Sequence, residues 1–382
     1  MFLILTISLV CTRRGQQASG QNSATYDRYW NDVAKILAGM EIEKNSKLAP
    51  VAETKEFERH RQYFETAWPR VEEELLSPMK QWVGEELTDV QDESPVFYPF
   101  SGPDFLNIFH LYSDGPEYYM FGLEKPGTAP DLANIPEAQM PGYLAGVRRA
   151  LASILQYSFF QTIHMEQDLT RSDLGAAPVL MTFVARTGNR VLNAYNVYIG
   201  EDGDWHEGTP SRQELVDQEK ELGHIPRSIP GIRILFQRPD HRQIQAVTFF
   251  SLDASNDGLD KNDLIIKFLK KKGPFRTFLK AASYLMYHPA FSRIQHFILQ
   301  ESNFILQDDS GMPLTAFSQD YWDLRFYGSY TRPIPLFGNR YQSDLRTIYV
   351  DGTRVRPLPF GIGYKWRKGE SNLMAARRKE SN

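Results

Sequence analysis

Apolar residues near the start of the chain recur at helical spacing. The first series is Tyr29, Trp30, Val33, Ile36, Leu37 and Met40, and a second series runs from Phe57 to Trp82 among many charged residues. Such spacing is typical of amphipathic helices. We therefore predict helices over residues 26–92, bent or broken near Pro69 and Pro78. Packing against the following domain is the simpler interpretation of their apolar faces, and a lid or partner-binding arm is the alternative.

From Val96 onward the pattern changes to short apolar runs separated by turn residues. A strand at 96–100, a helix at 105–111 and a strand at 118–123 would form one β-α-β unit. Further predicted elements are a helix at 141–169, strand pairs 178–186 with 190–198 and 231–237 with 243–252, a helical stretch at 261–301, and strands at 303–308, 322–330 and 358–366. The predicted fold class is α+β: a mixed sheet with one β-α-β unit plus antiparallel hairpins, helices packed on it, and a helical N-terminal appendage. The expected division is 1–20 signal peptide, 21–95 helical region, 96–366 α+β core domain and 367–382 disordered tail.

Composition narrows the class of protein. The chain has 382 residues, of which 42% are hydrophobic, so wholesale disorder is excluded. The net charge of −4 lacks the basic excess of a dedicated nucleic-acid binder. After residue 11 no apolar stretch is long enough to span a bilayer. We therefore expect a soluble chain with no transmembrane segment in its mature form and no nucleic-acid partner.

The first residues suggest export. Residues 2–11 are apolar, too short to span a membrane, and suited to the core of a signal peptide cleaved after Gly20. The absence of a basic residue before this run, and the presence of Arg13 and Arg14 after it, are atypical. Cleavage would remove Cys11, the single cysteine. The predicted location is periplasmic or secreted; the alternative is a cytoplasmic protein with a frayed apolar N-terminus.

The first candidate site is the turn Ser101-Gly102-Pro103-Asp104. A strand that enters a helix through such a turn can present backbone N–H groups to an anion. Glu124 follows the next strand, and in dinucleotide-binding folds an acidic residue about twenty positions on holds ribose hydroxyls. The spacing also suits the adenosyl methyl donor. Only one of the three fingerprint glycines is present, and helix capping by Ser101 or Asp104 is the alternative.

The second candidate site follows a later strand. Asp308 and Asp309 can place an acid beside a base, with Ser310 next to them, although an acidic turn explains the same residues. The aromatic C-terminal region, with interleaved basic residues, offers Arg325 and Tyr364 to a carbohydrate, peptide or polyanion; core packing is the alternative. The predicted catalytic residues are Ser101, Asp104, Asp308 and Asp309. The predicted ligand-binding residues are Gly102, Glu124, Ser310, Arg325 and Tyr364.

No cofactor and no metal site are predicted. The segment Asp253–Gly258 begins like a calcium loop, but its twelfth position is Leu264 instead of the bidentate glutamate. The histidines are scattered, and no His-Glu-x-x-His motif is present.

Four blocks carry a family resemblance: Phe97–Asp104, Phe121–Glu124, Leu306–Gly311 and Leu358–Tyr364. Together they resemble a group of uncharacterised bacterial proteins, many of which look exported, over about residues 96–366. The group has no known activity, so the resemblance implies a bacterial origin and a shared core architecture but no reaction.

Three functional hypotheses follow. The first is an exported protein that binds or hydrolyses a polar envelope ligand, a glycan or a peptide, in a pocket at strand ends. The second is a cytosolic protein that binds a nucleotide or the adenosyl methyl donor through the Ser101–Asp104 turn and Glu124. The third is a non-enzymatic scaffold whose helices over 26–92 bind a partner. Whether the protein is an enzyme stays open.

Overall fold

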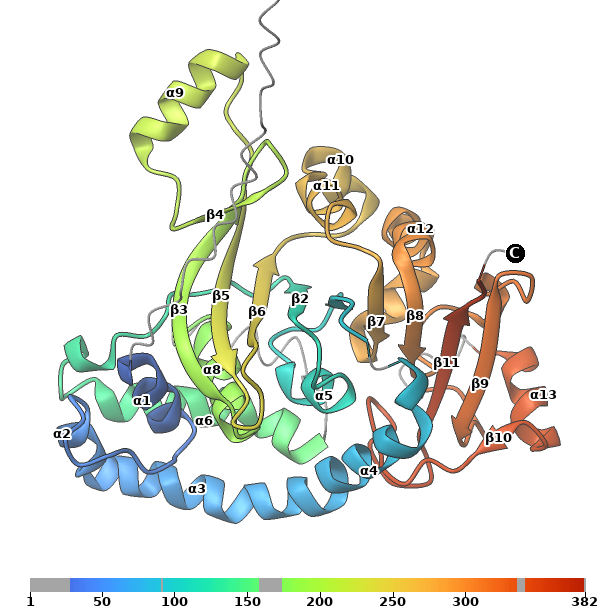
Figure 1. The fold of residues 1–382 in the computed structure, drawn as a ribbon, viewed down its shortest axis with the longest axis horizontal. Coiled ribbons are helices and arrows are strands. Elements are labelled where there is room, and N and C mark those ends of the chain that lie inside the picture. The colour runs from blue at the N-terminus through green and yellow to red at the C-terminus, as the bar shows by residue number, and fades with distance from the viewer. Residues whose placement is uncertain (1–27, 91, 158–173, 335–340, 381–382) are drawn as a thin grey trace, which may run out of the picture.

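A computed structural model describes residues 28–90, 92–157, 174–334 and 341–380 (Figure 1). The predicted signal peptide and the second half of the predicted helix at 141–169 lie outside the described residues. Within them, no helix is both long enough and apolar enough to cross a membrane.

One large mixed sheet organises the chain. Its strands are β1 Val96–Tyr98, β2 Glu117–Gly122, β3 Arg190–Ile199, β4 Trp205–Glu207, β5 Ile229–Gln237, β6 Ile244–Ser251, β7 Phe275–Leu279, β8 Ser302–Gln307, β9 Trp322–Gly328, β10 Val355–Arg356 and β11 Asn372–Arg378. They lie in the order β10-β9-β11-β8-β7-β1-β2-β6-β5-β3-β4. The α+β class with a mixed sheet and antiparallel hairpins is therefore confirmed.

The middle of the sheet is entirely parallel. β6, β2, β1, β7 and β8 are neighbours and all run in one direction. Numbered along the chain, these five strands have the order 3-2-1-4-5, which is a common order of doubly wound α/β sheets. Antiparallel strands extend it on both sides, with β5, β3 and β4 beyond β6 and with β11 and β9 beyond β8.

Helices cover both faces of the parallel strands, as the crossover connections require. They are α1 Arg28–Leu37, α2 Ala49–Ala52, α3 Lys55–Val71, α4 Ser77–Glu86, α5 Phe105–Leu111, α6 Met140–Tyr157, α8 Ala177–Arg186, α9 Arg212–Leu222, α10 Asn256–Lys261, α11 Leu264–Lys270, α12 Ser292–Glu301 and α13 Ser343–Asp351. The first apolar core joins α1, α3, α4, α5, α6 and α8 to one face, and the second joins α10, α11 and α12 to the other.

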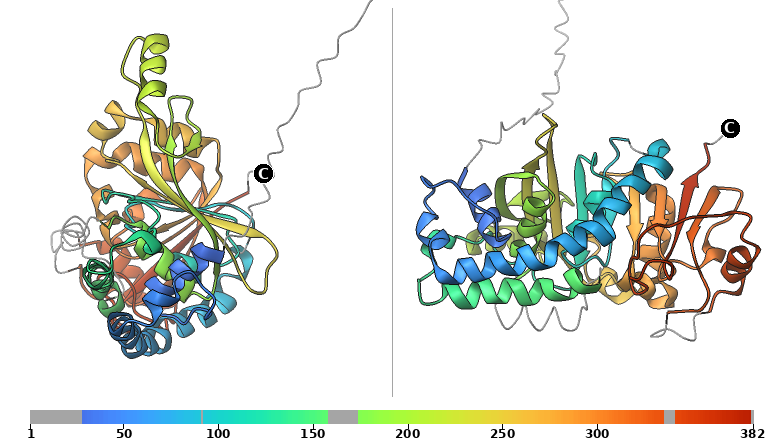
Figure 2. Two further views of the ribbon diagram at one scale, coloured as in Figure 1. Left: turned by 90° about the vertical axis from the view of Figure 1, so that its left-hand side faces the viewer. Right: turned by 90° about the horizontal axis from the view of Figure 1, so that it is seen from below.

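The N-terminal helices belong to the body of the molecule. Figure 2 shows α3 lying along α6 beneath the sheet. Leu37 of α1 and Phe64 of α3 are fully buried in the same core as Ile234 of β5, and the side chain of Arg186 donates to the carbonyl of Ala38 over 2.7 Å. The predicted helical region is thus present, and its apolar faces pack against the sheet. No break in the apolar core corresponds to the expected boundary at residue 95.

Four predicted elements were wrong. Residues 178–186 form α8 instead of a strand. Nearly every residue there is buried, so the sequence has no polar positions whose spacing would distinguish a helix from a strand. The predicted helical stretch 261–301 contains β7, and residues 358–366 form turns with one isolated bridge. The tail expected to be disordered contains β11, which is paired on both sides. The buried run Leu373–Ala376 is short and has polar residues on both sides in the sequence, so it was not recognised as a strand.

Candidate functional site

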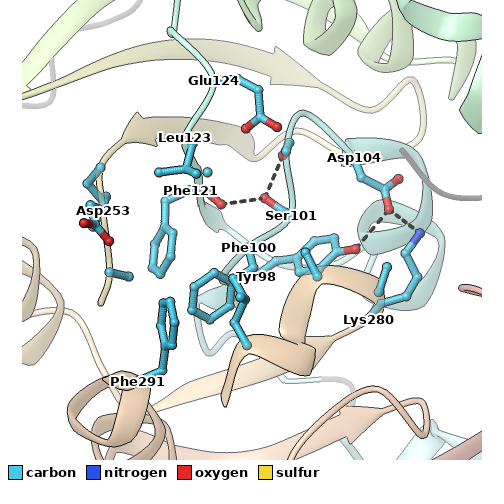
Figure 3. Close-up of a pocket in the computed structure, with 17 residues that line it drawn as sticks. Tyr98, Phe100, Ser101, Asp104, Phe121, Leu123, Glu124, Asp253, Lys280 and Phe291 are labelled. Atoms are coloured by element: carbon cyan, nitrogen blue, oxygen red, sulfur yellow. Dashed lines mark hydrogen bonds and ion pairs between the residues drawn. The ribbon is translucent and has the colours of Figure 1, made fainter. Parts of the chain in front are cut away.

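A cavity of about 90 Å³ opens where the parallel strands β1, β2, β6 and β7 end (Figure 3). We call it the carboxyl-edge cavity. Its apolar wall consists of Phe100, Phe121, Leu123, Leu252, Leu285 and Phe291. The ring of Phe100 lies edge-on to those of Phe121 and Phe291, with centroids 5.4 and 5.8 Å apart. Because Leu123 is 60% exposed, the wall reaches the surface.

Strained backbone shapes the loop that follows β1. Phe100 has φ +55° and Gly102 has φ +54°, a region that a bulky side chain rarely enters. The amide of Ser101 donates to the carbonyl of Phe121 over 3.0 Å, and its hydroxyl donates to the carbonyl of Gly102 over 2.7 Å. Ala281, across the cavity, also has positive φ, +54°. Strain in non-glycine residues is found preferentially at functional sites.

Asp104 joins the end of β1 to α5. Its carboxylate accepts from the backbone N–H of Asn107 over 3.3 Å and so caps α5. The same carboxylate accepts from the Nζ of Lys280 over 2.6 Å and from the hydroxyl of Tyr98 over 3.0 Å. Asp104 and Lys280 are 1% and 2% exposed, so this is a fully buried ion pair. Burial, reinforced by the negative charge of Asp104, raises the pKa of Tyr98 well above its ordinary value, so the phenol stays neutral.

Two further carboxylates line the carboxyl-edge cavity. Glu124, just beyond β2, is 4% exposed, and Asp253, beyond β6, is exposed at the rim. Gly122 leaves room for Glu124: a Cβ at Gly122 would lie 2.1 Å from its Oε2 and 3.4 Å from the amide nitrogen of Gly102. The carboxylate of Glu124 therefore reaches across the end of β2 to the turn that follows β1.

A second group of buried polar residues follows β8. Asp308 accepts from the amide of Ser310 over 2.9 Å and also from its hydroxyl. Asp309 pairs with the Nζ of Lys365, and both aspartates are 4% exposed. Burial, followed by repulsion from Asp309, raises the pKa of Asp308 to about 7. Burial also raises the pKa of Asp309, but Lys365 opposes that shift.

The two groups of residues meet at Lys280. A Cβ at Gly363, which has φ +65°, would lie 2.1 Å from Oδ2 of Asp308 and 3.4 Å from Cγ of Lys280. The side chains of Asp308 and Lys280 are therefore close neighbours. Asp104, Lys280, Asp308, Asp309 and Lys365 together form what we call the buried charge cluster.

The predicted site residues divide into three sets. Ser101, Gly102, Asp104 and Glu124 line the carboxyl-edge cavity. Asp308 lies beside Lys280, and it, Asp309 and Ser310 are outside the lining of the cavity. Tyr364 also lies near Asp308: burial raises the pKa of this phenol, and the charge of Asp308 adds to the shift.

Arg325, predicted to bind a carbohydrate, peptide or polyanion in the aromatic C-terminal region, does not line the carboxyl-edge cavity. It is on β9 and donates to the carbonyl of Glu86 and to the carboxylate of Asp89. Its side chain faces the end of α4. These contacts account for a basic residue in this aromatic region, so no ligand is needed to explain it. Asp253 likewise belongs to the helix start that follows β6, where its carboxylate accepts from the amide of Ser255 and the hydroxyl of Ser255 caps α10.

Two residues that line the cavity, Lys280 and Tyr98, were not predicted from the sequence. Lys280 was hidden because β7 was assigned to a helical stretch. Phe275-Arg-Thr-Phe-Leu after Gly273-Pro274 carries a strand signal, since aromatic residues and threonine favour strands. Tyr98 looked like an ordinary buried strand residue, and its hydroxyl contact is not visible in the sequence.

Comparisons of the chain with protein-family models, curated proteins and solved structures gave no significant match.

Proposed function

We propose that the carboxyl-edge cavity binds a phosphate-free nucleoside-type ligand, of which the adenosyl methyl donor is the member that fits best. The strand order 3-2-1-4-5 carries this proposal, because sheets of this order bind nucleosides at the carboxyl ends of their first strands. Glu124 ends the second of these strands, where an acidic side chain accepts hydrogen bonds from ribose hydroxyls. The aromatic wall beside it suits a flat base.

Charge argues against a phosphate-bearing ligand. The described residues that line the cavity include three carboxylates, those of Asp104, Glu124 and Asp253, and one ammonium, that of Lys280, which is already paired with Asp104. Pro103 has no N–H to offer, and Asp104 itself occupies the N-terminus of α5. A pyrophosphate placed here would meet negative charge. The adenosyl methyl donor carries a sulfonium, an ammonium and a carboxylate group but no phosphate, so its net positive charge complements the cavity.

Calorimetric titration tests the proposal with the adenosyl methyl donor, its demethylated thioether product, adenosine, ATP and NAD. We expect the donor to bind most tightly, and ATP and NAD not to bind. Glu124→Gln should weaken binding of the donor about 10- to 100-fold, since a hydrogen bond to a charged group contributes about 1.5–3 kcal/mol. Glu219→Gln on the exposed helix α9 is the matched control. Tight binding of ATP, or undiminished binding by Glu124→Gln, would refute the proposal.

A second candidate is an exported protein that binds a glycan or a peptide of the cell envelope at the same cavity. An aromatic wall next to carboxylates also suits a sugar ring, because the apolar face of the ring stacks while its hydroxyls donate to carboxylates. The apolar run at residues 2–11 supports export. N-terminal sequencing of the native protein from cell fractions distinguishes the two candidates. A chain that begins at Gln21 outside the cytoplasm favours the second, and a full-length cytoplasmic chain favours the first.

A further inference from the structure

The buried charge cluster holds an unequal number of charges. It contains three carboxylates and two ammonium groups, and all five side chains are at least nine-tenths buried. Leaving one buried negative charge without a partner is costly, and such a site takes up a proton instead. Among the described residues, Asp104 is paired with Lys280, and Asp309 with Lys365, so the carboxyl group left for the proton is that of Asp308.

The groups that face Asp308 come from several elements. Lys280 approaches from the end of β7 and Tyr98 from β1, while Asp309 is its neighbour in the chain. Tyr364 lies on the loop that carries Gly363, and Ser310 donates to the carboxylate. Among these, Lys280 is the single cation placed beside both Asp308 and a wall residue of the cavity. Burial and the charge of Asp309 hold the pKa of Asp308 near neutrality, within reach of ordinary pH changes.

Lys280 therefore has two possible anionic partners, and the proton on Asp308 decides between them. We propose that loss of this proton draws the ammonium of Lys280 from Asp104 toward Asp308 and leaves the carboxylate of Asp104 to the cavity. The cavity is then more negative at high pH, and a cationic ligand binds more tightly there. This inference deepens the proposed function, because it states how occupancy of the same site is regulated.

The first test uses the ligand-free protein, so that it does not depend on any ligand. Carbon-13 NMR follows the aspartate carboxyl signals during a pH titration, with Asp308→Asn identifying the signal of Asp308. We expect Asp308 to titrate near neutral pH and the Asp104 signal to show a step at the same pH. That step should vanish in Asp308→Asn. If Asp308 titrates with the ordinary aspartates, or if Asp104 shows no step, the switch does not exist.

A second variant moves the midpoint without removing the carboxyl group. The hydroxyl of Ser310 donates a hydrogen bond to the charged form of Asp308, in addition to the bond from its backbone amide, which alanine would retain. Loss of the hydroxyl bond disfavours the charged form. Ser310→Ala should therefore shift both titration steps to higher pH. An unchanged midpoint would contradict the assignment of the proton to Asp308.

The loaded protein supplies the functional test. With the adenosyl methyl donor as probe, affinity should rise by up to about tenfold per pH unit below neutrality and level off above about pH 8. The affinity for neutral adenosine should change little with pH. Asp253→Asn should weaken donor binding at every pH without moving the midpoint. If the donor does not bind at all, the proposed function fails while the titration of the ligand-free protein still decides the switch.

Discussion

Asp308 is a carboxyl group that the end of β8 keeps away from water. Its native pKa is about 7, whereas aspartate in an unfolded chain titrates near pH 4. Between about pH 4 and about pH 7 the native state therefore holds a proton that the unfolded state has released. The contribution of Asp308 to stability therefore falls there as the pH rises, by about 1.4 kcal/mol per unit, and is constant outside this window. In Asp308→Asn this loss is absent.

The prediction is a difference between two urea-unfolding series. The unfolding free energy of Asp308→Asn, relative to the native sequence, should increase from about pH 4 to about pH 7 and then level off. Asp257→Asn, at an exposed position on α10, should give a flat difference over the same range. A flat difference for Asp308→Asn as well would mean that the carboxyl group is ionised throughout.

At the residue scale, strand ends recognised in the sequence led to residues that line one cavity. Asp104 and Glu124 directly follow strands that the pattern identifies, so their meeting at one edge of the sheet was predictable. Lys280 was not, because its strand was not recognised. The pairing of Asp104 with Lys280 links residues 176 positions apart, and no local pattern encodes such a contact. The contacts of Arg325 with Glu86 and Asp89 were not predictable either, since basic and aromatic composition does not reveal which way a side chain faces.

At the element scale, a helix or strand could be predicted from the sequence when one of its faces is apolar and the other polar. The hairpin of β5 and β6 has clear turn residues and was predicted nearly to its ends. α8 and β11 are covered on all sides, so their sequences show no alternation to read. α9 is the reverse case: no residue of it is buried, and it is held by a capping box at Ser211 and a left-handed Gly223.

This contrast predicts opposite effects of two substitutions. Ser211→Ala should cost about 1 kcal/mol of the local stability of α9 and almost nothing in global unfolding, because no residue of this helix is buried. Ala375→Asp places a charge in the fully buried centre of β11, between β8 and β9, and should prevent folding or lower global stability by several kcal/mol. Hydrogen exchange reports the first effect and urea unfolding the second. Global destabilisation by Ser211→Ala would show that α9 is part of the cooperative core.

At the scale of the whole molecule, the sheet and the N-terminal helices share one apolar core. The sequence had predicted a boundary between them at residue 95. Trp82 of α4 lies edge-on to Tyr327 of β9 and to Phe360, with ring centroids 4.9 and 5.6 Å apart. The long helix α3 packs on α6 and contributes Phe64 to the core beneath β5. Helices and sheet should therefore unfold together, since neither buries its apolar face without the other.

Phe64→Ala tests this cooperativity in the intact chain. Phe64 is fully buried on α3, with the guanidinium of Arg186 4.5 Å from its ring centroid, and its removal should cost about 3–5 kcal/mol. If helices and sheet form one unit, the slowest-exchanging amides of β5 and β6 lose protection by the same free energy as those of α3. Arg59→Ala, on the exposed face of the same helix, should change neither set. Lost protection confined to α3 would instead establish the N-terminal helices as a separately folding appendage, and their removal would then leave the sheet and its cavity intact.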